Sequence, residues 1–166
     1  MTLAQMNHSN TQMNPLLGTW HLRRWEIGYD DQRPATYPFG ADASGMIIYS
    51  TDGWMSACIA KAGRARMSSE SVRTAPVEER LAAFESYFQY AGRYRLEEGA
   101  SGLQVVHEVT QTLNPNFLGT RQVRQVDLSE AGVLILSASD ALPGTSMRRH
   151  HRLIWQRALP ATAPAE

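Results

Sequence analysis

The stretch from Leu103 to Leu128 reads LQVVHEVTQTLNPNFLGTRQVRQVDL and contains two runs in which apolar and polar residues alternate. Such alternation predicts two β-strands with unlike faces. The Asn-Pro-Asn sequence at 114–116 predicts a turn between them. In the second run, Gln122 and Arg124 share a face with the apolar residues that follow. Core packing alone does not explain an arginine and a glutamine on such a face, so the stretch predicts the wall of a pocket.

Outward from this stretch, most of the chain is predicted to be extended. Strands are expected over residues 19–29, 46–50, 54–60, 92–97, 103–112, 119–128, 133–138 and 146–157. In the first strand, Trp20, Leu22, Arg24 and Glu26 are expected to share one face. Asp52-Gly53 predicts a hairpin turn, and both faces of that hairpin are apolar, so its inner face stays open.

The predicted strands are joined mainly by short links that carry Gly or Pro, which is typical of an up-and-down antiparallel meander. A sheet of this size with a single helix has an apolar face that must be covered, and closure also removes its exposed edges. We therefore expect an all-β fold, a closed antiparallel barrel of about eight to ten strands. The interior of such a barrel is wide enough for one small ligand.

One mid-chain helix is expected over about residues 75–90. Thr74 can cap it, Pro76 suits its first turn, and an apolar stripe follows at helical spacing. This stripe either packs on the sheet or also lines the pocket. The candidates for pocket lining are Phe84, Tyr87 and Tyr90. The segment 61–75 has no periodicity and is expected to be either a lid or a plain crossover.

Composition excludes several classes of partner. The 166 residues are expected to form one domain over 15–157 with flexible tails at 1–14 and 158–166. A formal net charge of zero argues against binding nucleic acid or an anionic membrane surface. Without a long apolar run or a signal-peptide pattern, we expect no membrane insertion and a cytoplasmic location. The single cysteine, Cys58, excludes an internal disulfide and is expected to be a small core residue.

Three predicted strands bring polar side chains to one interior. His107 shares a strand face with the valines at 105 and 109, and His151 shares one with the apolar residues at 153 and 155, so both are expected to face inward with Gln122 and Arg124. The sequence contains no cysteine cluster, no metal-binding histidine spacing, no glycine-rich nucleotide loop and no G-x-S-x-G motif. We therefore expect no metal site and no cofactor.

A buried Arg124 would need a partner, because an unpaired charge is costly inside a protein. An internal carboxylate, such as Glu26 or Glu108, is one answer. A carboxylate, phenolate or enolate of a ligand is another, because the planar guanidinium pairs with such groups through two bonds. The third alternative is the opposite register, in which Arg124 faces solvent.

The order of motifs resembles the bacterial and fungal lipocalin-like domain family of the calycin superfamily. The motifs are LLGTW (16–20), YPFG (37–40), GMIIYSTDGWMSA (45–57), FESYFQYAGRY (84–94), VVHEV (105–109), a Pro-Asn turn, GTRQVRQVDL (119–128) and LIWQR (153–157). The resemblance implies a closed barrel with a central cavity, and an arginine near the end of the last strand that packs on Trp20. Arg157 suits this position, and Arg152 is also available. Related barrels include cyclases and isomerases that work without a cofactor.

Three hypotheses follow. In the first, the barrel binds a small apolar or amphipathic, anionic-ended molecule and catalyses a cofactor-independent isomerisation or cyclisation, with His107, Arg124 and Tyr90 as catalytic residues. In the second, the barrel is a non-catalytic carrier. In the third, it is a filled interaction protein. The residues expected to bind ligand are Trp20, Tyr49, Trp54, Phe84, Tyr87, Phe88, Asn116, Gln122, His151 and Trp155. The partner is expected to be a small molecule, and the protein a monomer or homodimer.

Overall fold

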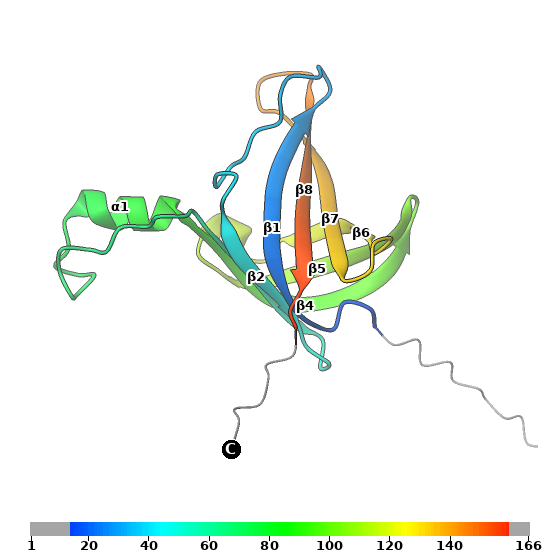
Figure 1. Cartoon of the computed structure of the whole chain (residues 1–166), viewed down its shortest axis with the longest axis horizontal. Coiled ribbons are helices and arrows are strands. Elements are labelled where there is room, and N and C mark those ends of the chain that lie inside the picture. Colours follow the sequence, from blue (N-terminus) through cyan, green and yellow to red (C-terminus); the bar gives the residue numbers. More distant parts are fainter. Residues whose placement is uncertain (1–13, 160–166) are drawn as a thin grey trace, which may run out of the picture.

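The computed structural model describes residues 14–159, which form a closed antiparallel barrel of eight strands (Figure 1). The strands are β1 (Gly18–Tyr29), β2 (Ser44–Tyr49), β3 (Trp54–Ala60), β4 (Tyr87–Gly99), β5 (Gly102–Thr112), β6 (Arg121–Asp127), β7 (Val133–Ala141) and β8 (Arg148–Arg157). One helix, α1 (Val77–Glu85), lies between β3 and β4, and a short 3-10 helix, Pro115–Phe117, joins β5 to β6. The predicted all-β barrel is confirmed. The two expected tails lie almost wholly outside the described residues.

Each strand pairs with its neighbours in the sequence, and β1 pairs with β8 to close the barrel. The predicted facing of the later strands is confirmed, because His107 is buried and Arg124 and Trp155 line the barrel interior. Val106, on the other face of β5, is buried as well. The hairpin of β2 and β3, whose facing the sequence leaves open, turns Ile47 and Ile59 inward. Within the described residues, no helix is long and apolar enough to cross a membrane.

The predicted face of β1 is wrong beyond Leu22. The register between β1 and β8 shifts between Leu22 and Arg24, so a β-bulge inserts one extra residue there. As a result Arg24 is exposed, whereas Ile27 is buried and Trp25 takes an inward position. The bulge therefore moves Arg24 to the surface and places the Trp25 indole inside the barrel.

The mid-chain helix is confirmed, but it ends at Glu85 rather than near residue 90. Residues 87–90 belong to β4 instead, where they pair with β3 from Tyr87 opposite Ala60 onward. A longer helix would satisfy its own backbone groups but would leave the facing edge of β3 without hydrogen-bond partners. The strand pairing satisfies both strands and also buries Tyr90. Propensity and the capping pattern are weaker than this tertiary pairing.

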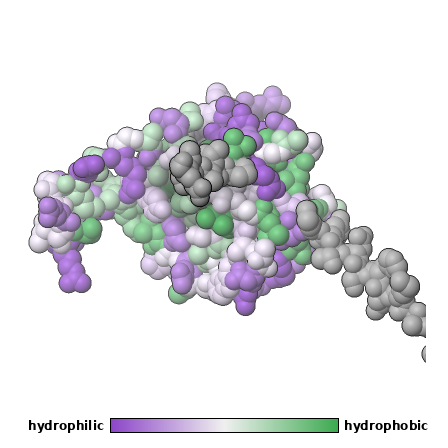
Figure 2. Space-filling view, turned by 60° about the horizontal axis from the view of Figure 1, so that its bottom comes forward, coloured by the Kyte–Doolittle hydropathy of each residue, from purple (hydrophilic) through white to green (hydrophobic). Residues whose placement is uncertain are grey.

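The helix does not pack on the sheet as its apolar stripe predicts. Val77, Leu81 and Phe84 are all exposed, and α1 buries no residue. The preceding loop contacts α1, where the Arg64 guanidinium donates to the Ser86 hydroxyl and the Ala83 carbonyl. Together they project from the barrel wall, and hydrophilic and hydrophobic residues are mixed over the projection (Figures 1 and 2).

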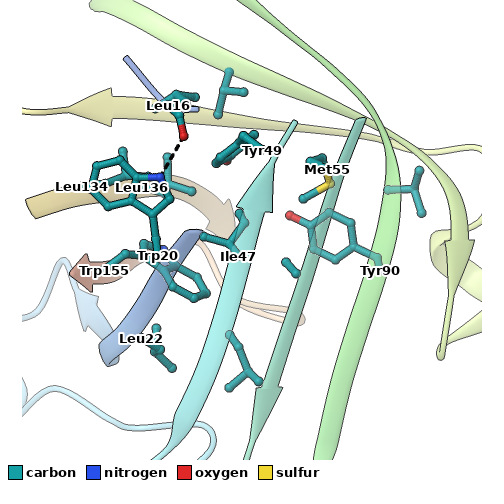
Figure 3. Close-up of a cluster of buried hydrophobic side chains, with 14 of the residues drawn as sticks. Leu16, Trp20, Leu22, Ile47, Tyr49, Met55, Tyr90, Leu134, Leu136 and Trp155 are labelled. Carbon is teal, nitrogen blue, oxygen red and sulfur yellow. Dashed lines mark hydrogen bonds between the residues drawn. The ribbon is translucent and has the colours of Figure 1, made fainter. Parts of the chain in front are cut away.

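One end of the barrel is closed by a compact aromatic core. The Trp20 indole is buried and donates to the Leu16 carbonyl at 2.8 Å (Figure 3). The Arg157 guanidinium lies over its ring at 4.0 Å from the centroid and also donates to the carbonyls of Leu17 and Pro15. The expected packing of Arg157 on Trp20 is thus confirmed, and Arg152 pairs with Glu26 instead.

Candidate functional site

A cavity of about 430 Å³ occupies the barrel between this closed end and the opposite rim. Its volume falls within the roughly 300–1,000 Å³ that is typical of small-molecule sites. Every strand of the barrel except β5 contributes to its wall. The lining residues are Trp25, Ile47, Ala57, Ile59, Phe88, Tyr90, Phe117, Gln122, Val123, Arg124, Leu136, Ala138, Ser139, Asp140, Arg149, His151, Leu153 and Trp155.

Aromatic rings form much of the apolar wall. Phe117, from the 3-10 turn, packs on Phe88 at 5.6 Å and near Tyr90 at 6.4 Å between ring centroids. The turn is held by the Asn114 side chain, which accepts from the Asn116 backbone N–H. Trp25 packs near Phe88 from the neighbouring part of the wall. The turn of the opening stretch therefore supplies one aromatic surface of the cavity.

His107 lies directly behind the wall rather than on it. Its side chain is fully buried, its Nε2 is 2.9 Å from the Tyr49 hydroxyl, and its Nδ1 is 2.7 Å from the Tyr90 hydroxyl. Burial, and then the positive charge of Arg124, lower the pKa of His107 to about 3. The imidazole is therefore neutral at physiological pH. Burial also raises the pKa of both tyrosines, which stay as neutral phenols.

Arg124 is half-buried on the cavity wall, and neither of its predicted internal partners, Glu26 and Glu108, forms an ion pair with it. Its guanidinium donates to the Gln122 side-chain oxygen at 3.1 Å and to the Val123 carbonyl at 2.9 Å, and both acceptors are neutral. Glu26 pairs with Arg24 and Arg152, and Glu108 pairs with Arg95. Within residues 14–159, no carboxylate lies within ion-pair distance of Arg124.

The rim of the cavity carries a separate charged group. The Arg149 guanidinium donates to both carboxylate oxygens of Asp140, and His151 Nε2 lies 3.4 Å from Asp140 Oδ1. Burial lowers the pKa of His151, although the Asp140 carboxylate opposes that shift. The charge of Asp140 is thus paired with Arg149 at the rim. In the described part of the chain, no group of three or more His, Cys, Asp or Glu side chains gathers in a metal-binding arrangement.

The structure brings together some of the predicted site residues and separates others. The predicted residues on the cavity wall are Phe88, Tyr90, Gln122, Arg124, His151 and Trp155. Tyr49 and His107 form the hydrogen-bonded layer behind it. Trp20 lies in the closed end. Their roles toward a ligand stay predictions.

The other predicted ligand-binding residues lie away from the cavity. Trp54 is exposed because it faces outward on β3, where Arg93 covers its ring at 4.5 Å. Phe84 is exposed because α1 projects from the barrel. Tyr87 faces outward one residue before Phe88, with Arg64 over its ring, and Asn116 is exposed at the tip of its turn. The segment 61–86 lines no part of the cavity, so the lid alternative gains no support.

Trp25 is the main lining residue that sequence reasoning missed. A signal was present, since the apolar residues of the first strand fall at 20, 22, 25 and 27. This pattern shifts the period-two phase by one residue, which indicates a bulge between Leu22 and Trp25. No comparable signal marks the small residues of the wall, such as Ala57 and Ala138.

Comparison with known proteins agrees with this architecture. A profile of the family described as "Lipocalin-like domain" matches residues 17–158, nearly all of the described chain. The chain belongs to the lipocalin-like domain family. The 4'-hydroxy-3'-methoxypropiophenone carrier protein of Aspergillus oryzae is 28% identical over 107 residues, which cover 62% of this chain and 96% of that protein. The predicted family is thereby confirmed. The distant relative from Aspergillus oryzae is named as a carrier of a small molecule.

Proposed function

We propose that this protein is a carrier that holds one small aromatic molecule inside its barrel and releases it chemically unchanged. The observation that carries the proposal is Arg124, a half-buried cation on the cavity wall whose hydrogen bonds, among residues 14–159, go only to neutral oxygens. A guanidinium in that position attracts an oxygen that is anionic or strongly polarised. The ligand therefore needs a polar oxygen at one end.

The rest of the cavity suits an aromatic body. Phe117, Phe88 and Trp25 present ring faces and edges to a volume of about 430 Å³, and aromatic pairs add to the energy of area burial. The name of the Aspergillus oryzae relative refers to an aryl ketone with a phenol and a methoxy group. A phenolic aryl ketone of that size is the ligand class that we propose here.

The geometry favours a carrier over an isomerase or cyclase. A proton-transferring residue needs to reach the substrate directly or through one water. His107 lies behind the wall, has both ring nitrogens engaged by tyrosines, and has a pKa lowered to about 3. Tyr90 does line the cavity, but its raised pKa makes it a poor base. Of the residues predicted to transfer a proton, His107 is thus out of reach of the substrate and Tyr90 is a poor base near neutral pH.

Titration calorimetry with 4'-hydroxy-3'-methoxypropiophenone tests the proposal. We expect one molecule to bind per chain, and Arg124→Met to weaken binding roughly tenfold to a hundredfold, because a hydrogen bond to a charged group contributes about 1.5–3 kcal/mol. Arg121→Met is the matched control, since Arg121 lies on the same strand and is exposed. Chromatography of the released ligand is expected to recover it unchanged. Equal binding by Arg124→Met and wild type, or conversion of the ligand, would contradict the proposal.

A further inference from the structure

Tyr49, His107 and Tyr90 form a hydrogen-bonded chain whose direction can be worked out. The chain runs from β2 through β5 to β4, with contacts of 2.9 Å at Nε2 and 2.7 Å at Nδ1 of His107. A neutral imidazole has one N–H and one bare nitrogen, so one tyrosine donates its hydroxyl hydrogen to the ring and the other accepts from it. The two tyrosines therefore cannot play the same role.

The two ends of the chain lie in different surroundings. Tyr49 is 1% exposed and lies off the cavity wall, and within residues 14–159 its hydroxyl bonds only to His107. If His107 carried its hydrogen on Nε2, the Tyr49 hydroxyl hydrogen would be buried without an acceptor, which carries the full cost of desolvation. Tyr49 therefore donates to Nε2, and the hydrogen of His107 sits on Nδ1 and points at the Tyr90 oxygen.

The Tyr90 hydroxyl hydrogen is consequently free to point elsewhere. Its ring lines the cavity, and its only hydrogen bond within the described chain is the one to His107. The Tyr90 oxygen accepts from His107, so its own hydrogen is available to a molecule in the cavity. The buried pair behind the wall thus makes Tyr90 a donor toward the ligand.

Trp155 lines the cavity from β8 with a side chain that is 1% exposed. Its indole Nε1 lacks a hydrogen-bond partner in the described residues, and this atom is buried against protein atoms, so it is closed to a molecule in the cavity. Figure 3 shows Trp155 beside Trp20, across the barrel interior from Tyr90. Trp155 therefore contributes apolar surface to the wall.

Two polar side chains of the cavity wall that could accept a hydrogen bond already have partners. The Gln122 side-chain oxygen accepts from Arg124, and its amide nitrogen donates to the Thr120 hydroxyl. Asp140 at the rim accepts from Arg149. The interior wall therefore offers hydrogens from Tyr90 on β4 and Arg124 on β6 and few free oxygens.

We infer that the cavity selects ligands by hydrogen-bond acceptors, with Tyr90 as the specificity-determining donor beside Arg124, and Tyr49 as a residue that positions Tyr90 through His107. The inference rests on the proposed carrier function and narrows its ligand class to molecules with a carbonyl or deprotonated oxygen. An isosteric molecule that lacks this oxygen leaves the donors unpaired and binds more weakly.

The direction of the chain can be measured without any ligand. Long-range proton–nitrogen NMR spectra of the ¹⁵N-histidine-labelled protein distinguish the two neutral tautomers, and His107→Gln assigns the signal. We expect the Nδ1–H form in the wild type. An Nε2–H form would overturn the inference, because Tyr90 would then donate to His107 and offer only an acceptor.

The selection itself is tested with a matched ligand pair. The aryl ketone above is compared with 2-methoxy-4-propylphenol, which has a methylene in place of the carbonyl. We expect the wild type to prefer the ketone by roughly three- to tenfold, and Tyr90→Phe to remove most of that preference. Tyr94→Phe is the control, because that hydroxyl bonds to Asn14 and Ser50 outside the cavity. An unchanged preference in Tyr90→Phe would overturn the inference.

Two further outcomes separate the inference from the proposed function. Tyr49→Phe does not touch the cavity, and we expect it to lower the ketone preference and to change the His107 tautomer signal together. A lower preference without a change in that signal would contradict the positioning role of Tyr49. If neither compound binds the wild type, the carrier proposal for this ligand class fails, and the NMR tautomer alone decides the direction of the chain.

Discussion

Burial of His107 makes the stability of the barrel depend on pH, and His107→Gln should remove that dependence. The folded protein holds the imidazole neutral, with its pKa lowered from 6.5 to about 3 by burial and by Arg124. The unfolded chain binds a proton on the same residue below pH 6.5, and the folded protein does not. Stability is therefore complete above pH 6.5 and falls as the pH drops from 6.5 toward 3.

The size of the effect follows from the shift. One proton bound only by the unfolded state changes the free energy of unfolding by about 1.4 kcal/mol per pH unit. Between neutral pH and pH 5 this amounts to about 2 kcal/mol. For a chain of this length, 2 kcal/mol corresponds to a fall in Tm of roughly 4–8 °C.

Urea unfolding at several values between pH 7.5 and 5 measures this loss. Glutamine stays neutral and can bond to Tyr49 and Tyr90, so we expect His107→Gln to be less stable than wild type at pH 7.5 but to lose about 2 kcal/mol less on acidification. His21→Gln, which changes an exposed histidine on β1, should keep the wild-type slope. The aspartates whose pKa values are lowered and the half-buried His151 remain in all three proteins, so their contributions cancel. Parallel losses in wild type and His107→Gln would refute the reasoning.

Two further predictions concern the barrel wall and its closed end. A Cβ atom on Gly92 would lie 1.9 Å from the Glu108 carbonyl oxygen, opposite the bulge in β5, so Gly92→Ala should cost about 3 kcal/mol or more by thermal unfolding. Gly28→Ala, with nothing within 4 Å, should change stability by under about 0.5 kcal/mol, and equal losses would contradict this reading. Arg157→Leu removes the cation over buried Trp20 and two hydrogen bonds to carbonyls, and should cost about 2 kcal/mol in urea unfolding. Arg93→Leu removes the same kind of contact from exposed Trp54 and should cost under about 1 kcal/mol, so the order of the two losses is the test.

The sequence predicts which residues of the last strands face inward, because successive side chains of a strand point to opposite faces. Val105, His107 and Val109 share one face of their strand, and Gln122 and Arg124 share a face with Val126 and Leu128, and the structure places these sets inside. The sequence does not predict where α1 ends. The run from Phe84 to Tyr90 fits a helical stripe as well as a strand, and pairing with β3 decides between them.

The partners of the polar residues depend on contacts across the barrel, which no local pattern encodes. The sequence brings Arg124 to the interior, but only the three-dimensional arrangement separates it from Glu26 and Glu108, because those carboxylates face outward to other arginines. The stretch Leu103–Leu128 by itself determines two strands, their inner faces and the turn that carries Phe117. Tertiary structure decides that His107 sits between Tyr49 and Tyr90 and that the Trp155 N–H has no partner in the described residues, since these contacts depend on how separate strands pack against one another.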